Sequence, residues 1–323
     1  MSLLEIYSLE SGDTFGYRVM SDLLCCSLRF RAVLFLSALL LVGGGCAGAA
    51  GIGEIPKADF TDDSLDSIME RIGSDPLSFL KQSLAETRTL KTFRMTFERQ
   101  SRLGLFKTLK PAERMVAEFR EDPFSVHFSW ISEGSEYAQC VYVEGKNKNR
   151  VALLPRSGFL GGKPAVSNYP IHFAVMFHKA RNPITDFGPR RMMERTLDRI
   201  EKAQSLGDVS IELMGAKKVG PDEEPCFHIK VVYPPADEFP SKLHDLYIST
   251  RTHLPMATYL WLSTTDERTP ETLDARYVYS HLEPNIALTD ADFVLAERQK
   301  DIGLGENEAA APAGYDTETT AAK

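Results

Sequence analysis

Residues 92–98 read TFRMTFE and place an apolar side chain at every second position. Residues 124–130, FSVHFSW, repeat this alternation with larger side chains. Neighbouring side chains of a strand point to opposite faces of a sheet, so a period of two predicts strands with one buried face. The two segments therefore predict a sheet whose inner face is rich in aromatic side chains.

The same alternation recurs along the chain, with short turn-forming connections between the segments. The further strands are expected at residues 114–119, 137–144, 151–154, 209–213, 227–233, 243–249, 256–263 and 273–281. Consecutive strands with short connections form antiparallel pairs, and a sheet of about ten strands tends to curl or close. We predict an α+β fold with a strongly curved antiparallel sheet, an incomplete β-barrel.

Helical periodicity predicts two short amphipathic helices at residues 65–72 and 76–84, and a longer one at 189–206. Such helices can cover the concave, apolar face of a curved sheet. Residues 168–179 fit a strand or a helix equally well. If the helices cover the sheet only in part, an apolar cavity remains, and a filled core is the alternative.

Composition excludes several classes of protein. The chain has 323 residues, 43% of them hydrophobic and 25% charged, which excludes a disulfide-stapled mini-protein, whole-chain disorder and a multi-span membrane protein. Its net charge of -8 disfavours nucleic acid as a partner, because phosphate binding needs a concentrated basic surface.

The N-terminal segment is typical of a secretory signal peptide. Arg29 and Arg31 precede an apolar run over residues 32–42, which is shorter than the ~20 residues of a membrane-spanning helix. The acidic residues near Met1 are unusual for such a signal, so Met20 is the alternative start.

Two processing sites compete at the end of this segment. The sequence AGA at residues 47–49 fits ordinary cleavage after Ala49, whereas GGGC at residues 43–46 resembles a lipoprotein box in which Cys46 is lipidated. We expect an exported, periplasmic or envelope-associated protein, anchored to the membrane if Cys46 carries lipid. The expected parts are a signal peptide at 1–49, a spacer at 50–60, the curved-sheet domain at 61–300 and a disordered acidic tail at 301–323.

Two cysteines remain in the expected domain, Cys140 and Cys226, each within a strand pattern. They can form one disulfide in an exported protein, or they can be two buried thiols that pack as small apolar groups.

Catalytic patterns are missing from the sequence. It contains no G-x-S-x-G motif, no H-E-x-x-H motif and no pair of histidines four residues apart. We therefore predict no enzymatic activity, no cofactor and no metal. The basic residues of the 189–206 helix, such as Arg195 and Arg199, either meet anionic lipid headgroups or form an ordinary solvated face.

Four blocks of sequence resemble an uncharacterised domain family of the bacterial envelope. They are residues 97–100 (FERQ), 119–126 (FREDPFSV), 141–147 (VYVEGKN) and 182–188 (NPITDFG). That family is similar in architecture to LolA, the periplasmic lipoprotein carrier, and to its relatives. The resemblance covers most of residues 65–300, and the more distant likeness to LolA rests on the late part of the chain, residues 253–255 (HLP) and 288–293 (LTDADF).

The resemblance and the predicted apolar face together suggest a function. We expect a non-enzymatic protein that binds or carries an acyl-bearing ligand, a lipid or a lipoprotein. The alternative is an envelope interaction module with a filled core that recognises a protein or a cell-wall polymer. The side chains expected to line the ligand site, chosen by alternation, are Phe93, Met95, Phe97, Phe124, Phe128, Trp130, Tyr259 and Trp261.

Overall fold

The structure, a computed structural model, describes residues 65–158, 162, 164–264 and 267–295. These residues belong to one compact unit of the chain. The expected signal peptide at 1–49 with Cys46, the spacer at 50–60 and the tail at 301–323 lie outside the described residues.

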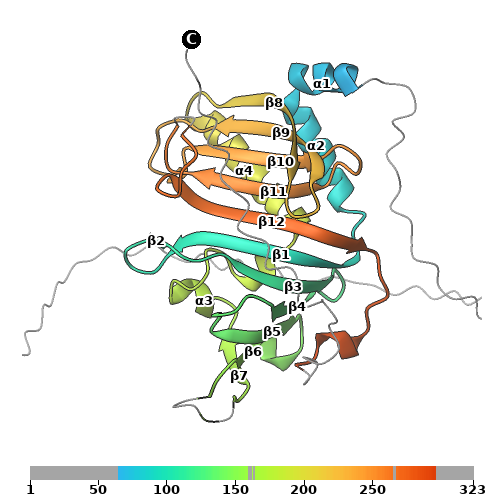
Figure 1. Ribbon diagram of the computed structural model, residues 1–323, viewed down its shortest axis with the longest axis vertical. Helices are drawn as coiled ribbons and strands as arrows, with labels where there is room; N and C mark the ends of the chain where they lie inside the picture. The colour runs from blue at the N-terminus through green and yellow to red at the C-terminus, as the bar shows by residue number, and fades with distance from the viewer. Residues whose placement is uncertain (1–64, 159–161, 163, 265–266, 296–323) are drawn as a thin grey trace, which may run out of the picture. The chain divides into compact units, whose positions relative to one another are not determined.

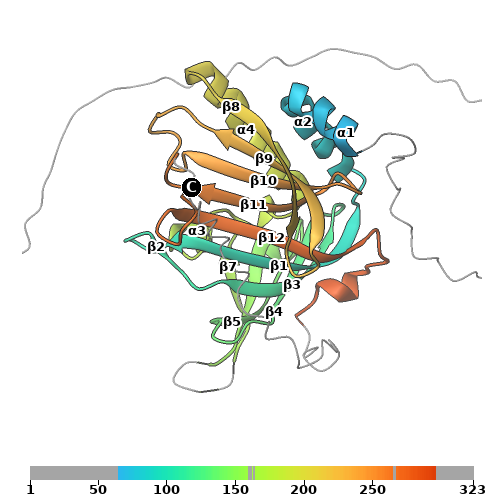
Figure 2. The ribbon, with the colours of Figure 1, turned by 45° about the horizontal axis from the view of Figure 1, so that its top comes forward.

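Twelve strands of the described chain form one antiparallel sheet (Figure 1). They are β1 (Thr92–Leu103), β2 (Thr108–Leu109), β3 (Glu113–Arg120), β4 (Ser125–Trp130), β5 (Tyr137–Val143), β6 (Arg150–Pro155), β7 (Ser167–Pro170), β8 (Ser210–Val219), β9 (Glu224–Val232), β10 (Leu243–Ser249), β11 (Pro255–Trp261) and β12 (Leu273–Pro284). Their order is β7-β6-β5-β4-β3-β1-β12-β11-β10-β9-β8, with β2 paired to β1 alone. The end strands β7 and β8 do not pair with each other, so the sheet is open, and Figure 2 shows how strongly it curves. The predicted curved antiparallel sheet is confirmed.

The pairing of β1 explains the alternation in its sequence. Phe97 lies opposite Met115 of β3 and Tyr279 of β12, so these three side chains share the inner face. Phe93 and Met95 are buried on the same face. The period of two therefore reports the concave face of the sheet.

Four α-helices accompany the sheet in the described chain. They are α1 (Leu65–Ser74), α2 (Pro76–Thr87), α3 (Phe173–Met176) and α4 (Pro189–Leu206), with short 3-10 turns η1 (Asn147–Asn149), η3 (Ile184–Asp186) and η4 (Asp290–Phe293). Asp75 caps α2 by accepting a hydrogen bond from the Ser78 amide at 3.0 Å, and a proline begins both α2 and α4. The ambiguous stretch 168–179 divides between β7 and α3, so both interpretations of it were partly right.

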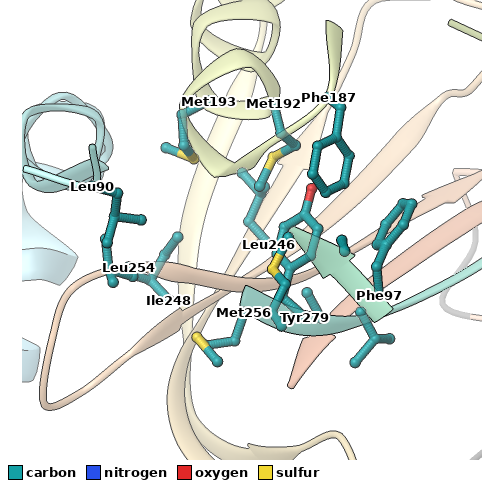
Figure 3. Close-up of a cluster of buried hydrophobic side chains, with 14 of the residues drawn as sticks. Leu90, Phe97, Phe187, Met192, Met193, Leu246, Ile248, Leu254, Met256 and Tyr279 are labelled. Atoms are coloured by element: carbon teal, nitrogen blue, oxygen red, sulfur yellow. The ribbon is translucent and has the colours of Figure 1, made fainter. Parts of the chain in front are cut away.

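The helices cover one half of the concave face. Helix α2 contacts α4 and β8, α1 contacts α2 and β8, and α4 contacts β11. Figure 3 shows Met192 and Met193 of α4 pointing toward Leu246, Ile248 and other buried side chains of the sheet. The core is therefore filled around Met193, Leu246 and Ile248.

The disulfide considered between Cys140 and Cys226 is not formed, and both are buried free thiols. Cys140 lies on β5 and Cys226 on β9, with six strands between them in the sheet. At about 4.8 Å per strand they are far beyond the reach of a disulfide. Burial raises the pKa of each thiol to about 12, so both stay protonated at neutral pH.

A buried polar network lies on the other face of β9 to β11. Asp245 is 1% exposed, accepts hydrogen bonds from Trp261 Nε1 at 2.8 Å and Arg268 Nε at 2.9 Å, and lies 2.9 Å from His228 Nε2. Burial raises the pKa of the Asp245 carboxyl, but the hydrogen bonds and charges of His228 and Arg268 outweigh it, so its pKa lies below the ordinary value. The carboxylate thus stabilises the folded state in its ionised form.

We expect Asp245→Asn to lower the free energy of unfolding by about 3 kcal/mol at neutral pH, because Arg268 and His228 lose the charge that they face. The folded-state pKa is depressed, so the stabilisation is fully present above the ordinary value of 3.8 and is lost as the pH falls through the lower folded-state value. Urea unfolding of both proteins at several pH values measures the difference.

The control is Glu223→Gln, which breaks the exposed pair between Lys218 and Glu223. It should change the free energy of unfolding by less than about 1 kcal/mol. An Asp245→Asn protein as stable as the wild type at neutral pH would show that the network contributes nothing.

Candidate ligand cavity

A cavity of about 470 Å³ lies on the concave face, between the sheet and the segment that runs from α3 into α4. Strands β4 to β7, β1 and β10 to β12 form one wall, and residues 171–199, with α3 and α4 as far as Arg199, form the other. Pro170, Lys179 and Asp198 on its border are exposed, so the cavity opens to solvent there.

The wall formed by β4 to β7 and α3 has no charged side chain among its described lining residues. It consists of Phe128, Trp130, Tyr137, Cys140, Val151, Leu153, Tyr169, Pro170, Phe173 and Ala174. The rings of Tyr169 and Phe173 stack with their centroids 4.0 Å apart, which joins α3 to the last strand of the sheet. This end of the cavity suits an apolar chain.

Phe187, in the loop before α4, lies between the cavity and the filled core. Its ring centroid is 4.7 Å from that of Phe128 and 5.2 Å from that of Phe97. Gly188 follows with φ +110°, a conformation that side chains disfavour, and a Cβ there would lie 3.8 Å from the Phe93 ring. The glycine lets the chain turn from Phe187 directly into α4.

Polar groups gather at the cavity wall formed by β1, β12 and the loop after α3. Burial raises the pKa of the Tyr277 hydroxyl, although the nearby charges of Arg181, Arg99 and Arg195 act in the opposite direction. All four residues line the cavity.

Each of these arginines has an acidic partner. Arg99 pairs with Glu113 at 2.7 Å, Arg181 with Asp274 at 2.6 Å and Arg195 with Asp186 at 3.3 Å. In each pair the carboxylate neutralises the charge of the arginine, so this wall is polar without a large net charge.

Arg199 is the exception among the lining arginines, since no described carboxylate lies within ion-pair distance of it. Its guanidinium lies over the ring of Tyr233 at 5.2 Å. The Tyr233 hydroxyl is 3.1 Å from His244 Nδ1, and His244 Nε2 is 2.5 Å from the Thr258 hydroxyl. Burial lowers the pKa of His244 to about 3, helped by the charge of Arg199, so His244 is neutral and Arg199 is the cation at this end.

Six of the eight predicted lining residues lie on the inner face of the sheet. Phe97, Phe128 and Trp130 line the cavity, whereas Phe93, Met95 and Phe124 share the inner face but pack in the filled core. That any of them contacts a ligand stays a prediction.

The prediction is wrong for Tyr259 and Trp261, which the structure places on the other face of the sheet. Thr258 and Leu260 of the same strand line the cavity, while Trp261 bonds to Asp245 and packs with Leu243 on the other face. Alternation predicts two faces for β11, but it does not say which of them faces inward, because Leu260 and Trp261 are both apolar.

Several cavity residues were not selected from the sequence. They include Tyr137, Tyr169, Phe187, Tyr277, Tyr279 and His244. The two tyrosines of β12 follow the same alternation as β1 and could have been found from it. Phe187 lies in a loop, where no periodicity shows its direction.

The described residues contain no group of three or more His, Cys, Asp or Glu side chains placed to hold a metal ion. None of their helices has the length and apolar character needed to span a bilayer.

Residues 90–301 match the model of a family described as a protein of unknown function, DUF1571. The chain belongs to the DUF1571 family. The resemblance of the sequence to an uncharacterised domain family is thereby confirmed. No curated protein matches this DUF1571 chain significantly.

Solved structures that are similar to the chain include two mycobacterial proteins and a member of the LolA superfamily. Lipoprotein LppX from Mycobacterium tuberculosis is 13% identical, with a TM-score of 0.38 over 67% of this chain and 100% of that one. LprF from Mycobacterium bovis is 10% identical, with a TM-score of 0.35 over 66% and 94%. A LolA superfamily protein from Nitrosomonas europaea is 9% identical, with a TM-score of 0.30 over 67% and 96%. At such identities the similarity concerns the fold alone.

Proposed function

We propose that this protein binds and carries an acyl-bearing amphiphile, a lipid or the lipid part of a lipoprotein, and that it does so in the envelope without catalysing a reaction. The observation that supports this is the open cavity. Its β4 to β7 wall is apolar, and other parts of its lining carry Arg199 and the group of Tyr277, Arg99, Arg181 and Arg195. The acyl chain lies along the aromatic wall, and the headgroup lies toward β10 to β12 and α4.

The energetics favour this placement of the acyl chain and the headgroup. Burying a methylene group is worth about 0.8 kcal/mol, so ten of them supply a gross stabilisation of about 8 kcal/mol before the cost of association. A hydrogen bond to a charged group adds about 1.5–3 kcal/mol. The apolar wall would therefore provide most of the affinity, and the polar side would select the headgroup.

An interaction module with a filled core, recognising a protein or a cell-wall polymer, is the competing function. Its core would need no open cavity beside the filled region under α4. The volume of about 470 Å³, within the range of about 300–1,000 Å³ usual for ligand pockets, favours the carrier. Lipid extraction and mass spectrometry of the purified protein test the choice: a protein that carries no acyl chain and takes up none is not a carrier.

We expect Ala174→Trp to weaken binding of a fluorescent fatty acid by at least about tenfold. Ala174 lines the cavity in α3, and an indole there would occupy space that the acyl chain needs. Fluorescence titration measures the affinity, and thermal unfolding verifies that the variant is folded.

Val175→Trp is the matched control, since Val175 is the next residue of α3 and does not line the cavity. It should bind the probe as the wild type does. Equal affinities for all three proteins would place the acyl chain elsewhere.

We expect Arg199→Gln to reduce the preference for a fatty acid over the corresponding fatty alcohol by about tenfold or more, because a charge-assisted hydrogen bond to the carboxylate is lost. Competition titrations with the two ligands measure the ratio. Arg191→Gln is the control, as Arg191 pairs with Glu194 on the same helix and does not line the cavity. An unchanged ratio in Arg199→Gln would remove this arginine from the headgroup site.

A further inference from the structure

Exposed apolar side chains concentrate at one place outside the cavity. Among the large apolar side chains of the described residues, the four most exposed are Phe106 at 91%, Leu105 at 82%, Met176 at 68% and Phe177 at 60%. The first two lie between β1 and β2, and the others at the end of α3. We call these four residues the docking patch.

The two parts of the docking patch are adjacent. The Gly104 amide donates a hydrogen bond to the His178 carbonyl oxygen at 3.2 Å, which ties the β1–β2 connection to the segment after α3. Figures 1 and 2 both show α3 beside β2. The four side chains therefore belong to one surface.

The local turn gives no folding reason for this exposure. The Lys107 amide donates to the Gly104 carbonyl at 3.1 Å, so Leu105 and Phe106 occupy the two central positions of a tight turn. Those positions favour polar residues and glycine. The leucine and phenylalanine found there remain largely exposed in the described chain. Their presence points to a partner.

The charges around the docking patch indicate the kind of partner. Residues 101–112 and 172–182 contain three lysines and two arginines but no aspartate or glutamate, in a chain of net charge -8. Lys179 pairs with Glu136 and Arg181 with Asp274, but Lys107 and Lys110 have no described carboxylate within ion-pair distance. Apolar tips flanked by free lysines fit an anionic membrane surface.

The docking patch also adjoins the cavity. Phe173 and Ala174 of α3 line the cavity wall, as do Lys179 and Ala180, immediately before and after the exposed part of the segment. A membrane bound at the patch would therefore lie next to the cavity opening at Lys179.

We propose that the docking patch inserts into the headgroup region of an anionic lipid membrane and holds the cavity opening at the bilayer surface. Leu105 and Phe106 enter the interface from the turn, Met176 and Phe177 from α3, and Lys107 and Lys110 meet the anionic headgroups. This docking does not depend on what the cavity binds.

The test uses Phe106→Trp in the full chain with vesicles of phosphatidylcholine containing about one third phosphatidylglycerol. Both native tryptophans are buried, so the difference between the spectra of the variant and the wild type reports on the patch. We expect its emission to shift to shorter wavelength and to be quenched severalfold by lipids brominated on their acyl chains. Pure phosphatidylcholine vesicles should have much less effect.

Met214→Trp is the control, because Met214 is an exposed apolar residue on β8, an end strand that four other strands separate from β1. Quenching of Phe106→Trp no stronger than that of Met214→Trp would overturn the proposal. So would a difference spectrum, Phe106→Trp minus wild type, that is typical of a buried indole in buffer alone, because it would show that another protein segment covers the patch.

A second pair of variants tests the contribution to binding. Leu105→Ser with Phe106→Ser should weaken association with the anionic vesicles by about tenfold, whereas Met214→Ser should not. Unchanged association would contradict the proposal. Fatty-acid binding by these variants is a separate measurement, so a failure of docking is distinguishable from a failure of the carrier function.

Discussion

The concave face of the sheet has to be covered, and most of the structure follows from how this is done. Alternation along the strands puts apolar side chains on that face from Tyr169 of β7 to Ile211 of β8. The sheet is open, so its strands cannot cover one another by closing into a filled barrel. The chain must supply the cover from its helices and loops.

Two kinds of cover result. Helix α4, 18 residues long, packs with α2 and fills the core around Met193 and Ile248, while Arg195 and Arg199 of the same helix border the cavity. Over β4 to β7 the cover is α3, which has four residues, and loops on either side of it. A cover this short cannot fill the curvature, so the aromatic wall of Phe128, Trp130 and Tyr169 borders open volume instead of a packed core.

The sequence predicts this architecture well where the signal is local. The strand positions, both N-terminal helices and the 189–206 helix follow from periodicity, prolines and caps, and all are present. The orientation of β11 did not follow, since Asp245, His228 and Arg268 fix Trp261 on the other face from elsewhere in the sequence. The cavity was predictable only as partial cover of an apolar face, because the direction of Phe187 and the pairing of the arginines depend on three-dimensional contacts.

Helix α3 contributes residues to both the cavity and the docking patch. Its sequence, FAVM, is apolar on all sides, and a buried helix would be the ordinary explanation. Yet none of its residues is buried: Phe173 and Ala174 face the cavity, while Met176 and the following Phe177 face outward. Together the two proposals explain both apolar sides of the helix, one facing the acyl chain in the cavity and the other facing a membrane. A change of its position at a bilayer would alter the border of the cavity directly, since this one short helix carries Phe173 and Ala174 of the wall and Met176 of the docking patch.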